Sequence, residues 1–260
     1  MKKGQVLLIL VMLLATALTI TLTATYQSIT ETQLTKLEEE NQKTLAAAEA
    51  GIEKALQLKQ GGSFTSLGLS NLSGINTLES SVEISNQGNN TFVTPLLQKD
   101  EQYTFYLAPY NSQTKNFSGN SLSQNINICF GTSNSNPALE ITIIKSDYTI
   151  RRYAINPINN SYIENGLTAS SPNQNDCPPN LSFTNRYTIN ANDIGNNSLI
   201  LIARVIGNSS TRIGFRANNS FPIQGTTIIS SARSTAGVEK KIKLFQSYPQ
   251  IPSDFFITSF

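Results

Sequence analysis

Residues 1–27 read MKKGQVLLILVMLLATALTITLTATYQ, two lysines and a glycine followed by a long apolar stretch. No charged side chain occurs from Gly4 to Thr30. Residues 6–25 are 20 in number, eleven of them Leu, Ile or Val, and a helix of that length crosses about 30 Å of hydrocarbon. The two lysines are then expected on the cytoplasmic side, with the rest of the chain outside the membrane.

A cleaved secretion signal is the alternative interpretation of this stretch. It would have an apolar core at residues 6–14 and a cleavage site at Ala15-Thr16-Ala17. The sequence that follows favours a retained helix. No proline occurs before Pro95 and no glycine between residues 4 and 51, so nothing in this region is expected to break a helix.

Beyond residue 25 the pattern becomes amphipathic. Apolar residues recur at intervals of three and four, as on one face of a helix, and Gly61–Gly62 supplies a stop. We therefore expect one helix from Gln5 to about Lys59, with a transmembrane half at 6–25 and an amphipathic half at 26–59. The apolar positions are Leu34, Leu37, Leu45, Ala48, Ile52, Ala55 and Leu56.

After Gly62 the chain consists of short alternating runs separated by Asn- and Ser-rich turns, which predicts about ten strands and no second helix. The fold class is therefore α+β, with a long N-terminal helix on a mainly antiparallel, β-rich domain at 61–260. The runs are SVEIS, YTFYLAPY, NINICF, ALEITII, YTIRRYAI, LSFTNRYTI, SLILIARVIG, TRIGFRA, TTIISSARS and VEKKIKLF.

Composition argues against catalysis. The 260 residues include no histidine and no tryptophan, and Lys plus Arg (19) nearly balance Asp plus Glu (17). Without histidine, the Ser/His/Asp and Cys/His nucleophile arrangements and His-based zinc sites are impossible. A carboxylate-pair or Ser/Lys mechanism needs no histidine, so a secreted hydrolase is a further alternative, but no constellation of groups points to one. We expect no enzyme, no cofactor and no metal site.

The two cysteines, Cys129 and Cys177, allow one disulfide if the domain lies outside the cytoplasm. Such a bridge would contribute about 4 kcal/mol through loop entropy. Two buried thiols are the alternative.

Two polar features have both a functional and a structural interpretation. A basic C-terminal region could contact DNA or an anionic surface, although lysines and arginines that protect strand edges explain it more simply. The Asn and Asp residues at 173–176 and 190–193 could bind calcium, but neither has the spacing of a calcium loop, and turn formation is favoured. Between Ile194 and Ser253 there is one acid, Glu239, and the basic residues are Arg204, Arg212, Arg216, Arg233, Lys240, Lys241 and Lys243.

A short basic leader ending in glycine, followed by an apolar helix that becomes amphipathic, resembles the type IV pilins and pseudopilins. KKGQVLLILV at the start and AAAEAGIEKAL at 46–56 are similar to the N-terminal segment of PilX-type minor pilins and of the related tip pseudopilins of type II secretion. GTTIISSARSTAGVEKKIKL at 225–244 is similar to the closing β-hairpin of such proteins. The resemblance implies a pilin-like fold.

The resemblance also implies processing and partners. Residues 1–4 would be a leader that prepilin peptidase removes between Gly4 and Gln5, with methylation of Gln5 afterwards. Major pilins carry glutamate at the fifth mature position, where this chain has Ile9. In that family the carboxylate pairs with the charged amino terminus of the subunit ahead in the growing filament. A subunit without it needs no subunit ahead, which fits a tip or initiating role.

The block Ala47, Ala48, Glu49, Ala50, Gly51 and Ile52 is expected to serve packing. Small residues let a neighbouring helix or sheet approach closely. We expect the first half of the block to pack helices together in a filament, while Leu45, Ile52 and Leu56 contact the globular domain.

The sequence therefore favours a minor pilin that initiates or caps a type IV pilus-like filament. It would be stored as a single-pass protein of the inner membrane and would then lie on the cell surface, with other pilin subunits as partners and an exposed β-domain for a surface ligand or DNA. The alternative is a permanently anchored surface protein that presents a ligand-binding, adhesive β-domain and never joins a filament.

Overall fold

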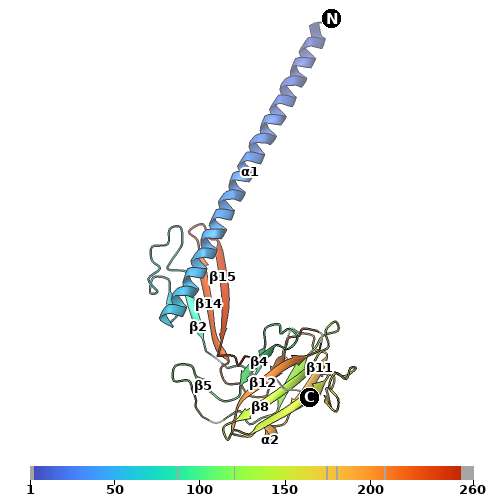
Figure 1. The fold of residues 1–260 in the computed structure, drawn as a ribbon. Helices are drawn as coiled ribbons and strands as arrows, with labels where there is room; N and C mark the ends of the chain where they lie inside the picture. Colours follow the sequence, from blue (N-terminus) through green and yellow to red (C-terminus); the bar gives the residue numbers. More distant parts are fainter. Residues whose placement is uncertain are drawn as a thin grey trace. The chain divides into compact units, whose positions relative to one another are not determined.

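A computed structural model describes residues 3–86, 88–119, 121–173, 175–179, 181–207 and 209–252, with side chains from Leu10 onward. The chain forms two compact units. Unit 1 comprises Met1–Ile84 and Thr227–Leu244, and unit 2 comprises Ser85–Thr226 and Phe245–Phe260. The expected class, one long N-terminal helix and a mainly antiparallel β-domain, is confirmed at that level (Figure 1).

The N-terminal helix α1 runs without interruption over Lys3–Leu58. Its threonines do not break it, because the hydroxyls of Thr16, Thr19, Thr21, Thr23 and Thr25 donate to carbonyls three or four residues back at 2.8–3.1 Å. The helix ends where Lys59 adopts a left-handed conformation (φ 55°), one residue after Leu58.

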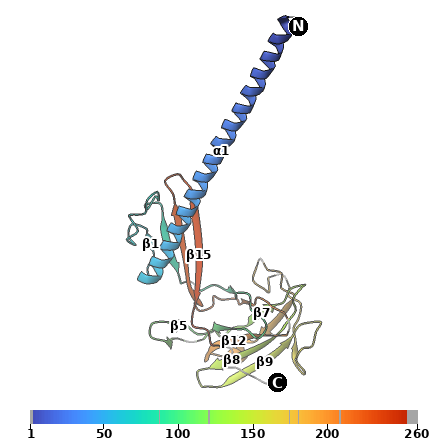
Figure 2. The same ribbon diagram turned by 45° about the horizontal axis from the view of Figure 1, so that its top comes forward.

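Unit 1 places the last turns of α1 on a four-stranded sheet of order β1-β2-β14-β15. Figure 2 shows the end of the helix lying along these strands. The core between them contains Ala47, Ala48, Ile52 and Ala55 from the helix, packed against residues that include Phe64, Ile228 and Ala232. The strands are β1 (Gly62–Ser63), β2 (Ser81–Ser85), β14 (Gly225–Arg233) and β15 (Glu239–Ser247).

Unit 2 contains a five-stranded sheet of order β10-β9-β8-β12-β4. Its neighbours pair antiparallel except for the short parallel pair β10–β9. The strands are β4 (Gln102–Tyr106), β8 (Ala138–Lys145), β9 (Ile150–Asn156), β10 (Leu167–Thr168) and β12 (Ser198–Ile206).

A four-stranded antiparallel sheet of order β11-β7-β13-β3 forms the other half of unit 2. The two sheets share one buried core, in which the rings of Phe105 on β4 and Phe215 on β13 stack with centroids 4.3 Å apart. The remaining elements are β3 (Thr91–Val93), β7 (Ile126–Phe130), β11 (Asn185–Ile189), β13 (Gly214–Arg216), the pair β5 (Tyr110–Asn111) and β6 (Asn116–Phe117), and the four-residue helix α2 (Ala191–Ile194).

Candidate functional site

The first candidate site is the N-terminal half of α1, which lacks protein packing. No residue from Leu10 to Glu39 is buried or half-buried, and large apolar side chains such as Leu14 (63%) and Leu22 (69%) are exposed. An apolar surface of this extent does not remain in water. By length and composition this helix can cross a membrane, which is compatible with a single-pass anchor.

The leader residues lie at the start of this helix. The backbones of Gly4, Gln5 and Ile9 are helical. Their side chains lie outside the described residues, so the expected cleavage site and the position without glutamate stay predictions.

The small-residue block lies at the other end of α1, and the structure divides it between two faces. Ala47, Ala48, Gly51 and Ile52 are buried in unit 1, whereas Glu49 is exposed and Ala50 half-buried. These four buried residues, together with Ala55 (0% exposed), are called the small-residue face of α1.

The expected roles of two leucines and two alanines were wrong. Leu45 (42%) and Leu56 (37%) are exposed, so they do not hold the helix on its sheet. Ala47 and Ala48, which were expected to face neighbouring helices, are instead buried against the sheet and hold the helix there. The physical reason is position on the helix: the small-residue face, Ile52 included, points into the core of unit 1, whereas Leu45 and Leu56 lie outside it.

Gly51 is the point of closest approach. A Cβ at this position would lie 2.4 Å from the Ser230 Oγ on β14 and 3.0 Å from the ring of Phe64. No side chain larger than hydrogen fits there without displacement of a neighbour. The glycine of the AAAEAG block is therefore required by packing within unit 1.

The second candidate site is a polar cavity in unit 2, beside the disulfide between Cys129 and Cys177. Its volume is about 350 Å³, within the range of small-ligand sites. Strands β7, β11 and β13 and the loop before Cys177 contribute to it. The polar cavity is lined by Asn90, Asn125, Asn127, Asn175, Asp176, Thr188, Arg216, Ala217 and Asn218.

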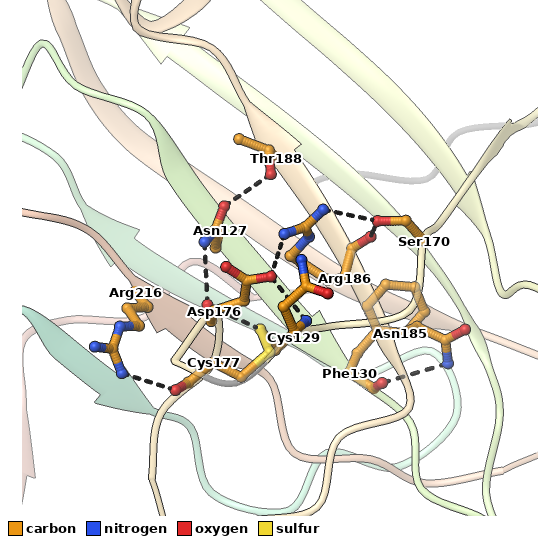
Figure 3. The surroundings of a disulfide bond; sticks show 11 residues. Asn127, Cys129, Phe130, Ser170, Asp176, Cys177, Asn185, Arg186, Thr188 and Arg216 are labelled. Carbon is orange, nitrogen blue, oxygen red and sulfur yellow. Dashed lines mark hydrogen bonds and ion pairs between the residues drawn. A yellow bond between two sulfur atoms is a disulfide. The ribbon is translucent and has the colours of Figure 1, made fainter.

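Hydrogen bonds fix the wall of this cavity (Figure 3). The Asn127 amide donates to the Asp176 carbonyl (3.1 Å), and its Oδ1 accepts from the Thr188 hydroxyl (2.7 Å). The Asp176 carboxylate is ion-paired with Arg186. The Arg216 guanidinium donates to the Cys177 carbonyl at 3.0 Å. The bridge therefore holds a loop whose backbone the strands bind at two further points.

The basic C-terminal residues do not act together as one surface. They are divided between the two units, and Arg204 pairs with Asp100 (3.1 Å) while Arg233 pairs with Glu79 (2.7 Å). Arg212 donates to a backbone carbonyl. The lysines Lys240, Lys241 and Lys243 lie on β15, an edge strand, where positive charge discourages pairing with other strands.

Of the two Asn/Asp segments, the first forms a turn before Cys177 and the second forms the short helix α2. Asp176 accepts a bond from the Asn173 backbone at 2.8 Å, and Asp193 lies in α2 and pairs with Arg151. Within the described ranges no group of three Cys, His, Asp or Glu residues could hold a metal ion.

Sequence reasoning singled out Arg216 only as one of several basic residues and did not find the polar cavity. Its amides come from β7 and from four segments outside the strands, and asparagine is so frequent in this chain that no local pattern marks them. No protein-family model, curated protein or solved structure matches this chain.

Proposed function

We propose that this chain is a non-catalytic, minor pilin-like subunit that initiates or caps a type IV pilus-like filament. The observation that carries the proposal is the continuity of α1. One helix contains both the bare apolar segment and the small-residue face that unit 1 holds. A helix of this kind can be stored in a bilayer and later packed among other helices, and both environments cover its apolar surface.

The N-terminal sequence supports the same proposal. Prepilin peptidase would cut between Gly4 and Gln5 and leave the rest of α1 in the inner membrane, with unit 2 outside. In major pilins a glutamate at this position pairs with the charged amino terminus of the subunit ahead, because burying an unpaired charge is costly. Ile9 supplies no such carboxylate. This favours a tip or initiating position over the bulk of a filament.

The mature N-terminus tests the proposal. We expect mass spectrometry of the full chain purified from membranes to show a start at a methylated Gln5. An intact Met1 would support the second candidate, a permanently anchored surface protein that presents a ligand-binding β-domain, which the polar cavity favours. A start at Leu18 would mean a cleaved signal and would overturn both.

Two matched variants sharpen this test. Gly4→Leu should leave the leader in place, because the peptidase needs a small residue at the cut. Ala17→Leu alters only the alternative signal-peptidase site and should leave the Gln5 start unchanged. The reverse pattern contradicts the proposal.

Filament entry needs a second measurement. Sheared surface filaments should contain the protein in small amount relative to the bulk subunit, and Gly4→Leu should remove it from that fraction. Retention of the wild-type protein wholly in the membrane fraction would favour the anchored protein instead.

A further inference from the structure

We propose that the polar cavity of unit 2 binds an acidic saccharide, a sugar that carries a carboxylate. The cavity is enclosed by neighbouring strands of one sheet and by the disulfide-held loop, so its walls are parts of one compact unit. Nothing in the proposed filament role requires such a cavity. The inference relies on that role only for the exposure of unit 2 outside the membrane.

Hydrogen-bonding groups remain available in the cavity. Both ends of the Asn127 amide are occupied, which makes this residue a fixed part of the wall. The side-chain amides of Asn90, Asn175 and Asn218 make no hydrogen bond with any other described residue. An amide offers two donors and one acceptor oxygen. Sugar hydroxyls both donate and accept, so they match this set.

The charge in the cavity selects an anion. The carboxylate of Asp176 is already neutralised by Arg186 and also accepts from the Asn173 backbone. The Arg216 guanidinium bonds a neutral carbonyl and has no carboxylate within ion-pair distance among the described residues. Guanidinium binds carboxylate through two parallel hydrogen bonds. The cavity therefore has a positive charge placed beside neutral amides.

Other ligand classes fit this lining less well. Ala217 is the one apolar residue among the lining residues described, so an apolar ligand would displace water from the polar side chains without replacing its hydrogen bonds. The same lining holds no aromatic ring on which a nucleobase could stack. A single available cation is too little for a nucleic-acid backbone, whose binding depends on neutralising several phosphates.

The disulfide gives the site its shape. Cys129 lies two residues after Asn127 on β7, and Cys177 directly follows Asp176 and bonds Arg216 through its carbonyl. The bridge thus fastens the wall that contains Asp176 to the strand that contains Asn127. Reduction should weaken binding even where the two sheets remain folded.

The experiment uses the full chain in a zwitterionic, sugar-free detergent. Ligand-observed NMR titration compares glucuronic acid and N-acetylneuraminic acid with glucose, galactose and acetate. We expect at least one acidic sugar to bind about tenfold or more tightly than the neutral sugars and acetate. Acetate separates recognition of the whole sugar from recognition of a carboxylate alone.

Variants locate the binding. Arg216→Gln should weaken it roughly ten- to hundredfold. Arg212→Gln should leave it unchanged, because Arg212 flanks the same strand but lies outside the polar cavity. Asn218→Asp adds a negative charge at an exposed lining position and should also weaken it. Since Asn218 is exposed, this variant tests the site even if Arg216→Gln perturbs the fold.

Several outcomes would overturn the inference. These are no binding of either acidic sugar, equal binding of glucose and glucuronic acid, equal binding of acetate, or no effect of either cavity variant. The mature N-terminus is measured separately. A failure here with methylated Gln5 therefore refutes the sugar site alone, whereas a start at Leu18 refutes the proposed function.

Discussion

Gly51 on α1 lies against Ser230 on β14 so closely that an added Cβ would be 2.4 Å from the serine hydroxyl oxygen. The backbone of the helix therefore contacts side chains of its neighbours directly at this point. Ser230 is fully buried, and its Oγ has no hydrogen-bond partner among the described residues. The close packing of helix and sheet here is therefore accompanied by one buried hydroxyl that makes no hydrogen bond with the described residues.

Gly51→Ala should destabilise unit 1 although alanine is the better helix former. The gain in helix propensity is about 1 kcal/mol, whereas overpacking a filled core costs about 1–3 kcal/mol. We expect a net loss of up to about 2 kcal/mol in the free energy of unfolding, measured by urea denaturation of the full chain in detergent. Glu49→Gln, on the exposed face two residues away, should change it by less than about 0.5 kcal/mol.

Ser230→Ala should relieve the same contact. Removing a buried hydroxyl without a partner is expected to be neutral or to stabilise the protein by about 1 kcal/mol. In that background Gly51→Ala should cost about 1 kcal/mol less than in the wild type, because the nearest obstructing atom is absent. Additive effects of the two substitutions would show that the residues are not in contact.

The disulfide is expected to stabilise unit 2 substantially. Cys129 and Cys177 are 48 residues apart, and closing a loop of that length lowers the entropy of the unfolded chain by about 4 kcal/mol in free energy. Cys129→Ser combined with Cys177→Ser should lose about 2–5 kcal/mol, measured by thermal denaturation.

A phosphine reductant provides the control for this prediction. It should lower the unfolding temperature of the wild type and leave that of the double serine variant unchanged. Equal sensitivity of both proteins would contradict a stabilising bridge.

Gln224 should stabilise β4 by pairing with backbone groups on its outer edge, where no strand from the described part of the chain is bound. Its buried side-chain amide accepts from the Tyr106 N–H and donates to the Tyr106 C=O, both at 2.8 Å, in place of a neighbouring strand. Gln224→Ala leaves both backbone groups unpaired and should cost about 2–4 kcal/mol. Gln250→Ala is the matched control, because Gln250 bonds Thr104 in the same way but is itself exposed.

Water can replace the exposed amide of Gln250, so its loss should cost about 1 kcal/mol or less. The measurement is urea denaturation of the two variants side by side. Equal losses would show that burial does not distinguish the two sites.

Tyr106 should make the protein sensitive to alkali. Burial, together with the neighbouring Tyr110 and Tyr248, raises the pKa of Tyr106 from its usual 10 to about 12. Below pH 10 the neutral phenol is present in both states, and the stability is unaffected. Between pH 10 and 12 the unfolded chain ionises first, so the free energy of unfolding falls by roughly 3 kcal/mol.

Tyr106→Phe should reduce this alkaline loss, although it should be about 1 kcal/mol less stable at neutral pH because the hydroxyl donates to the Pro249 carbonyl at 2.7 Å. Tyr148→Phe should leave the pH profile unchanged, since Tyr148 is 92% exposed. The check is urea denaturation at a series of pH values. An alkaline fall that is identical in Tyr106→Phe and wild type would rule out this assignment.

Local sequence was sufficient to predict α1 and the longer strands, but the expectation of no second helix was wrong, because α2 spans only four residues and leaves no helical period. α1 followed from the absence of Pro over its length and of Gly between residues 4 and 51, and each of the ten predicted runs overlaps a strand. The short strands β1, β3, β6 and β10, of two or three residues, were missed, because so few residues carry no alternation.

Local sequence could not predict which side chains meet. The helical period places Leu45, Ala48 and Leu56 on one stripe, but only the alanine points into the core of unit 1. The polar cavity combines Asn127, Thr188 and Arg216, which are far apart in the chain and come together only through strand pairing. Such long-range information is absent from spacing and composition.

The strands that complete the binding face for α1 are the last ones in the chain, since β14 starts at Gly225. During translation α1 is made first, and more than half of the 260 residues follow before β14 and β15 exist. A stop codon anywhere before residue 225 would remove Ile228 and Ala232 from the residues that cover the small-residue face. Complete packing of the end of α1 in unit 1 thus requires that translation has passed β14.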